Sequence, residues 1–258
     1  MLKKIIPIAL VALVAAIGGY FYAQYNPPKP PVQVQAPLPP KPVTRQVLET
    51  PQTPLPALAE SDGFILDGLA ALVGDKSLMA YFIPKRIIRN IVVTIDNLPA
   101  GKLSLRMMPV REAPGRFITG GGENHLTISP ANAARYTPYV KIAEAIDTKK
   151  LVEFYVCAYP LFQQAYEELG YPNKYFNDRL LAVIDHLLAA PDIQEPVQLI
   201  RPKVFYEYAN PDFEARSIGQ RILMRIGSKN EAIIKAKLRD IRQELVLHLR
   251  GQKVEGVK

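Results

Sequence analysis

Eight polar or charged residues of this 258-residue chain have the types and spacing that ligand binding requires. Asp178 and Asp185 stand seven residues apart and so share one face of a helix, while Arg179 and His186 share the adjacent face. The candidate binding residues are Arg135, Tyr136, Asn177, Asp178, Arg179, Asp185, His186 and Glu207. If they converge, they predict a polar cleft, and two carboxylates across a cleft suit cleavage of a glycosidic bond.

The same residues also have a structural interpretation, which we favour. A set of Asp, Arg and His side chains can form an ion-pair network that fixes the register of packed helices. Asn177 or Asp178 can cap the helix that follows Tyr175. The positions of these side chains in space decide between the two interpretations.

No pattern in the sequence predicts a catalytic residue, a metal site or a cofactor. His125, His186 and His248 are too scattered for a zinc spacing such as His-Glu-x-x-His. The three glycines from residue 120 could cradle a phosphate, but no Lys-Ser or Lys-Thr pair follows them. Cys157 is the only cysteine, so no intramolecular disulfide forms, and its position within a helix predicts a buried, inert thiol.

Two apolar-striped helices, predicted over residues 148–169 and 176–187, must position most of these polar side chains. Their apolar residues recur at three- and four-residue steps, which is the period of an α-helix. Gly170 and Pro172 end the first helix, and the short loop predicts that the two helices are antiparallel neighbours. Pro160 predicts a kink or a break within the first helix, because it removes a hydrogen bond and clashes with the preceding turn.

Further helices are predicted on the N-terminal side of this pair. One covers residues 62–73, and a second begins at Pro84 and carries a buried face of isoleucine and valine. Ser129-Pro130 and Thr137-Pro138 each resemble an N-cap followed by proline at the first helical position. They predict two short, separate helices.

The β-structure is predicted to be small. Residues 116–129 contain two β-prone runs around a Gly-rich tip, which predicts a hairpin. Residues 197–200 and 204–208 are also β-prone, but Pro202 lies between them and confines them to edge or extended segments.

Two helices are predicted at the C-terminal end. Asn210 starts one that Gly227 ends, and Ser228 and Glu231 have the spacing of a capping box for the last helix. The basic residues of that helix are predicted to form a solvated face, although they could instead meet an anionic lipid or glycan. These residues are Lys235, Lys237, Arg239 and Arg242.

The N-terminal part predicts a membrane anchor and a tether. Residues 5–25 carry no charge and would span ~32 Å as a helix, about one hydrocarbon core. Lys3 and Lys4 precede them, so the N-terminus is predicted to be cytoplasmic and the rest exported. A cleaved signal peptide is the alternative. Residues 26–57 hold eleven prolines and predict an extended linker.

The predicted fold class is therefore mainly α. We expect a multi-helix globular domain with a small β-hairpin, preceded by a single transmembrane helix. The predicted boundaries are an anchor at 1–25, a Pro-rich linker at 26–57, an exported helical domain at 58–250 and a flexible tail at 251–258.

Several long runs resemble one bacterial family, in the same order along the chain. They include YFIPKRIIRNIVVTIDNLP, ISPANAARYTPYV and AYEELGYPNKYFNDRLLAVIDHLL. The family is known as domain of unknown function 3014, and the resemblance covers about residues 58–245. It implies a single-pass envelope protein with a largely helical exported domain, and it carries no activity or functional residues to this chain.

The sequence favours a non-enzymatic binding or scaffold protein, anchored in the inner membrane with its domain in the periplasm. Its expected partners are the lipid bilayer, through residues 5–25, and an envelope protein or an anionic glycan. The net charge of +8 is a mild bias toward anions and does not predict nucleic-acid binding. One alternative is a hydrolase or lyase that acts on peptidoglycan or another glycan through Asp185 or Glu207. Another is lipid or small-ligand binding between helices, which requires a sizeable apolar cavity.

Overall fold

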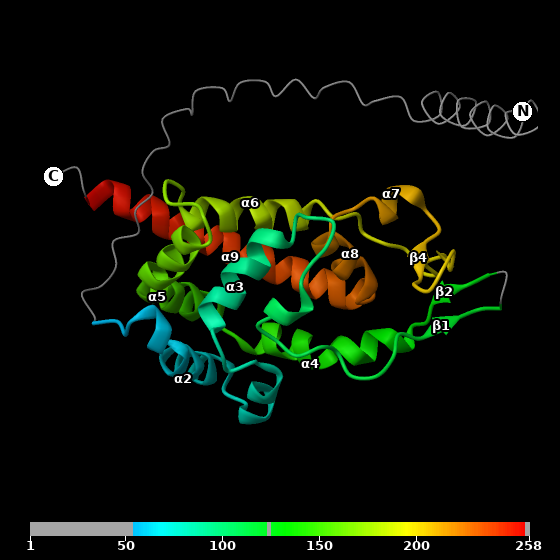
Figure 1. Ribbon diagram of the computed structural model, residues 1–258, viewed down its shortest axis with the longest axis horizontal. Helices are drawn as coiled ribbons and strands as arrows, with labels where there is room; N and C mark the ends of the chain where they lie inside the picture. Colours follow the sequence, from blue (N-terminus) through cyan, green and yellow to red (C-terminus); the bar gives the residue numbers. More distant parts are fainter. Residues whose placement is uncertain (1–53, 123–124, 256–258) are drawn as a thin grey trace, which may run out of the picture. The chain divides into compact units, whose positions relative to one another are not determined.

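The computed structural model describes residues 54–122 and 125–255. In this domain, four helices pack against helix α5 (Thr148–Glu168). These four helices are α2 (Asp62–Val73), α3 (Ile87–Asn97), α6 (Phe176–Leu188) and α9 (Ser228–Glu255). The domain is mainly helical with a small antiparallel hairpin, as predicted, and Figure 1 shows α9 running along its length. Helix α5 and α6 are joined by the short loop that the sequence predicted.

The remaining elements are short, apart from α4 (Ala131–Ala145). They are the 3₁₀ helices η2 (Leu58–Glu60), η3 (Lys76–Tyr81) and η4 (Leu105–Met107), the helices α7 (Pro211–Glu214) and α8 (Ile218–Arg225), and the strands β1 (Thr119–Gly120), β2 (Thr127–Ile128), β3 (Leu199–Ile200) and β4 (Glu207–Tyr208). None of the helices described here is long and apolar enough to cross a bilayer. The predicted anchor, residues 5–25, and residues 26–53 of the predicted linker lie outside the described residues.

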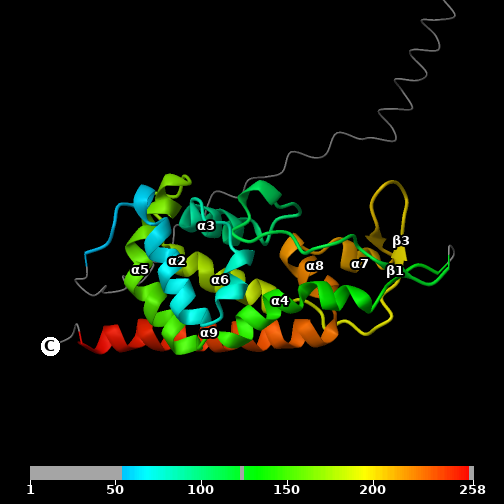
Figure 2. The same ribbon diagram turned by 90° about the horizontal axis from the view of Figure 1, so that it is seen from below.

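The named strands form two small antiparallel hairpins that contact each other. β1 pairs with β2, which confirms the predicted hairpin, and β3 pairs with β4. Backbone hydrogen bonds join them, because Ile128 N–H donates to the Val197 carbonyl at 3.0 Å and Leu199 N–H donates to the Leu126 carbonyl at 2.7 Å. Figures 1 and 2 both show the hairpins at the end of the domain away from α5.

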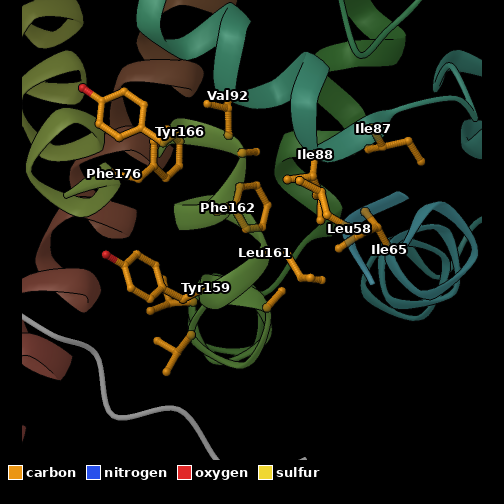
Figure 3. Packing of buried hydrophobic residues seen from close by; sticks show 14 of the residues in the cluster. Leu58, Ile65, Ile87, Ile88, Val92, Tyr159, Leu161, Phe162, Tyr166 and Phe176 are labelled. Atoms are coloured by element: carbon orange, nitrogen blue, oxygen red, sulfur yellow. The ribbon is translucent and has the colours of Figure 1, made fainter. Parts of the chain in front are cut away.

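An aromatic cluster between α5 and α6 forms the centre of the main core. The rings of Phe162 and Phe176 are stacked, with centroids 5.9 Å apart, and Tyr166 packs on Phe176 at 5.6 Å. Figure 3 shows Phe162 directed toward Ile88 of α3, with Leu58 and Ile65 beyond it. Aromatic pairs of this kind add stabilisation beyond the area that they bury.

Helix α3 begins later than the sequence predicts, because its cap comes from another helix. Pro84 lies before the helix, and the first helical residue is Ile87. The carboxylate of Asp62, at the start of α2, accepts the backbone N–H groups of Arg86 at 2.7 Å and Ile87 at 2.8 Å. Arg86 adopts a left-handed conformation, with φ of 51°, that turns its N–H toward this carboxylate.

Prolines interrupt the helices less than predicted. Helix α4 is continuous through Pro138, where the sequence predicts the start of a separate helix, and α5 continues through Pro160 without a break. Tertiary contacts compensate for the missing backbone hydrogen bonds, since α4 packs along α9 and α5 along α3 and α9.

The helix predicted from Asn210 to Gly227 is instead two helices, α7 and α8. The backbone N–H groups of Ile218 and Gly219 donate to the carbonyls of Ala100 and Leu98, at 2.7 and 2.9 Å. This contact directs the first turn of α8 against the end of α3, so the chain must leave the helical path before it. A Cβ on Gly219 would lie 3.0 Å from the Leu98 carbonyl oxygen, which explains the glycine.

The first turn of α9 also differs from the prediction. Ser228 does not cap Glu231, because the Glu231 N–H donates to the Gly227 carbonyl at 2.9 Å. The Ser228 N–H and hydroxyl donate instead to the Glu195 carboxylate, at 3.1 and 3.2 Å. Glu231 and Lys235 are buried, each only 2% exposed, and form an ion pair at 2.8 Å. The prediction of a solvated face is therefore wrong for Lys235, which also donates to the Ala190 carbonyl at 2.7 Å.

Lys235 stays charged in this position. Desolvation lowers its pKa, but hydrogen bonds and charges from Asp192 and Glu231 outweigh that effect and raise the pKa above its ordinary value. A buried ion pair becomes destabilising when one partner is removed, because the other charge is left without compensation.

We expect Lys235→Met to lower the free energy of unfolding by about 3–5 kcal/mol. The matched control is Lys229→Met, on an exposed position of the same helix, with an expected change within ~0.5 kcal/mol. Urea unfolding followed by circular dichroism measures both. The double variant Glu231→Leu/Lys235→Met should recover most of the loss, and a single variant as stable as the control would contradict the assignment.

Candidate apolar binding site

A cavity of about 280 Å³ lies between helices α2, α3, α5, α6 and α9. Aromatic rings from α5 and α6 and aliphatic side chains from the other helices line it. An apolar cavity of about 150 Å³ is already large enough to bind benzene or xenon in another protein. The lining residues include Leu69, Ile91, Phe154, Tyr155, Leu180 and Ile241.

The position of Phe154 explains why its ring does not fill this space. Gly68 of α2 has no Cβ, and a Cβ there would lie 2.2 Å from the Phe154 ring. The ring therefore lies close to the α2 backbone and next to Phe64, with ring centroids 5.6 Å apart. The rings act as spacers between α2 and α5, and the space beside them remains open.

One polar pair borders the cavity. Tyr155 lines it, and its hydroxyl donates to Asn177 Oδ1 at 2.5 Å. Asn177 is 2% exposed, and its Nδ2 has no hydrogen-bond partner among the described residues. Burial, with a smaller contribution from Tyr159, raises the pKa of the Tyr155 phenol well above its usual range, so this hydroxyl remains a donor.

The other predicted binding residues hold neighbouring segments together. Arg135 donates to the carbonyls of Pro114 and Gly115, both at 2.9 Å, and so fixes the loop before β1. Its guanidinium also lies 5.6 Å from the ring centroid of Tyr136. Tyr136 packs against a second apolar cluster, formed by residues of α6 and α8.

Arg179 and Asp178 lie on α6 but do not act together. Arg179 Nε pairs with Asp96 Oδ1 at 2.7 Å, which connects α6 to α3. Tyr171 donates to the other oxygen of Asp96 at 3.2 Å. Asp178 is partly buried, and desolvation raises the pKa of its carboxyl. The Arg179 interaction corresponds to the ion-pair interpretation of the sequence.

The structure places Asp185, His186 and Glu207 in three different environments. Asp185 is exposed and is held by Arg242 of α9, whose hydrogen bond lowers the pKa of the carboxyl. His186 Nε2 lies 2.8 Å from the Ser217 hydroxyl, and Glu207 lies on β4, opposite Ile200. None of the eight predicted residues lines the apolar cavity.

Two further pockets are either smaller or more open than the apolar cavity. One of about 190 Å³ lies beside Glu195 and the first residues of α4 and α9, and an open groove lies where α4, α5 and α9 meet. None of the eight predicted residues lines either of them.

Within residues 54–122 and 125–255, no group of three His, Cys, Asp or Glu could hold a metal ion. Cys157 is partly exposed on α5, whereas the sequence predicts burial.

Sequence reasoning placed the cavity-lining residues in the core and did not identify them as a site. The stripe that includes Phe154, Tyr155 and Phe162 has the period of any buried helix face. Asn177 is the predicted binding residue that lies nearest to this site, and it stands in the polar first turn of α6, before Asp178 and Arg179. It borders the cavity only through Tyr155.

The family model described as Protein of unknown function (DUF3014) matches residues 87–242. This match covers more than half of the chain, so the chain belongs to that family, as the sequence runs predicted. The matched segment includes the cavity-lining residues of α3, α5 and α6. No curated protein and no solved structure matches the chain significantly.

We expect Tyr155→Phe to lower the free energy of unfolding by about 1–3 kcal/mol, because Asn177 Oδ1 loses its donor inside the core. The control is Tyr175→Phe, at a partly exposed position. Urea unfolding of the full chain measures both, and equal stability of the two variants would contradict a buried hydrogen bond.

The raised pKa of Tyr155 also predicts a pH dependence. Above about pH 10 the unfolded chain releases the phenolic proton while the folded chain retains it. The free energy of unfolding therefore falls as the pH rises through this range, and it falls less steeply in Tyr155→Phe than in the wild type.

Proposed function

We propose that this chain is a membrane-anchored binding or scaffold protein of the bacterial cell envelope. Its domain would lie in the periplasm, held by the anchor and the Pro-rich linker predicted at residues 5–25 and 26–57. Its ligand would be an alkyl or acyl chain, taken up between α2, α3, α5, α6 and α9. The observation that supports a binding function is the apolar cavity of about 280 Å³ beside the Tyr155–Asn177 pair.

The energetics of the cavity favour an occupant. The exposed wall of the cavity is apolar, so water inside it gains no hydrogen bonds from the protein, and an apolar ligand displaces that water at little cost. Each methylene moved from water into such a space contributes about 0.8 kcal/mol. An alkyl chain therefore gains affinity from every methylene that it places in the cavity.

The wall of the cavity indicates how the ligand would be oriented. Most of the lining is hydrocarbon, so the ligand segment inside must be apolar. Tyr155 is the one polar side chain among the lining residues, and its hydroxyl is engaged by Asn177 Oδ1. The cavity therefore accepts a hydrocarbon segment, and a polar end of the ligand would lie outside it.

The alternative of a hydrolase or lyase that acts on peptidoglycan needs an acid and a base at one place. Asp185 is engaged by Arg242, and a lowered pKa makes its carboxyl a poor proton donor at neutral pH. This favours the binding protein over the enzyme.

The proposal is tested by photocrosslinking in cells that produce the full chain. The cells are supplied with a fatty acid that carries a diazirine and an alkyne, irradiated, and the labelled peptides are mapped by mass spectrometry. We expect labelled peptides from α5 and α6. Peptides from residues 5–25 are disregarded, because a membrane anchor would be labelled in any case.

A pair of variants on α2 gives the matched control. Leu69 lines the cavity, whereas Leu66 is also partly buried but does not line it. Leu69→Phe should lower labelling of α5 and α6 about fourfold, equivalent to one lost methylene at ~0.8 kcal/mol, and Leu66→Phe should not. Equal labelling of both variants, or no label on α5 and α6, would count against the proposal.

A further inference from the structure

The loop between β3 and β4 exposes large apolar side chains at its tip. Val204 is 70% exposed and Phe205 is 80% exposed, and Ile200 at the end of β3 is 46% exposed. Phe205 is the most exposed of the large apolar side chains that the structure describes. Exposed apolar side chains that are grouped in this way mark a contact site for a protein or a membrane, whereas single ones do not.

Positive charge accompanies these apolar side chains. Arg201 and Lys203 are exposed in the same loop, and the sequence contains no acidic residue from Ile200 to Tyr206. The nearest carboxylate along the chain is Glu207, which lies on the strand and not at the tip. The tip therefore combines two cations with Val204 and Phe205.

Hydrogen bonds hold the base of the loop against α8. Tyr208 on β4 is 1% exposed, and its hydroxyl donates to the Arg221 carbonyl at 3.1 Å. Arg225 donates to the Tyr206 carbonyl at 3.2 Å and lies over the Tyr208 ring. The hairpin thus projects the tip from a fixed support, and Figure 2 shows the β3–β4 loop standing away from the helices.

We propose that the loop of residues 200–206 docks on an anionic lipid bilayer, with Val204 and Phe205 inserted at the interface and Arg201 and Lys203 at the headgroups. Aromatic rings favour the membrane–water interface, and cations near an anionic surface are attracted to it. A projecting loop of this size presents far less area than the ~800 Å² per partner of a stable protein interface. This inference does not depend on the apolar cavity or on its ligand.

The absence of tryptophan from the sequence makes a direct test possible. Phe205→Trp introduces one fluorophore at the tip of the full chain. The protein is reconstituted with vesicles of phosphatidylglycerol and phosphatidylcholine, with and without bromine on the acyl chains. We expect a blue shift of the Trp emission and strong quenching by the brominated chains.

The control places the fluorophore on the far end of α9. Leu247 is 52% exposed, and Figures 1 and 2 both show the C-terminal end of α9 at the opposite end of the domain from the hairpins. Leu247→Trp should keep the emission of a Trp in water. Equal quenching at both positions would overturn the proposal, because it would mean that the domain contacts lipid without using the loop.

The charge requirement is tested in the same system. In the Phe205→Trp background, Arg201→Gln and Lys203→Gln should each weaken docking about fivefold. Vesicles of phosphatidylcholine alone should also reduce the quenching. Unchanged quenching in all three cases would overturn the role of anionic lipid. Emission that shifts only when envelope proteins are added would overturn it as well, and would assign the loop to a protein partner.

Discussion

The stacking of Phe162 on Phe176 is the contact on which the rest of the domain depends. It joins α5 to α6 across the loop that makes them antiparallel, and Tyr155 and Tyr166 extend the cluster in both directions. Because the rings are wide and rigid, they hold the helices apart as well as together. The apolar cavity is a consequence of that spacing, since side chains of α2, α3 and α9 reach the rings without filling all the space beside them.

Polar contacts determine where the surrounding helices are placed on this core. Asp62 of α2 caps α3, Asp96 of α3 binds Arg179 of α6, and Lys235 of α9 binds the carbonyl of Ala190 after α6. Each contact satisfies groups that would be costly to bury alone. The residues whose types suggested a binding cleft are thus largely used within the domain. The space available to a ligand is formed instead by the apolar faces that these contacts bring together.

The two ends of the domain differ in chemistry. The helical end encloses an apolar cavity, whereas the hairpin end presents Phe205 and Val204 beside Arg201 and Lys203. The two proposals assign a separate contact to each end, an alkyl chain between the helices and a bilayer surface at the β3–β4 loop. Because the two features share no residue, each can be tested without disturbing the other.

The sequence alone determined that the domain is mainly helical and which faces of α5, α6 and α9 are apolar, because both follow from a period of 3.6 residues within one helix. The β1–β2 hairpin was also predictable from local sequence, because two β-prone runs flank the glycines at its tip. Only the tertiary structure decided that Asp62 caps a helix in which it does not lie, that Pro138 does not interrupt α4, and that Lys235 is buried. The cavity belongs to the same group, since its size depends on how five helices approach one another. Local periodicity specifies the elements, but contacts between residues far apart in the chain decide how they pack and what space remains between them.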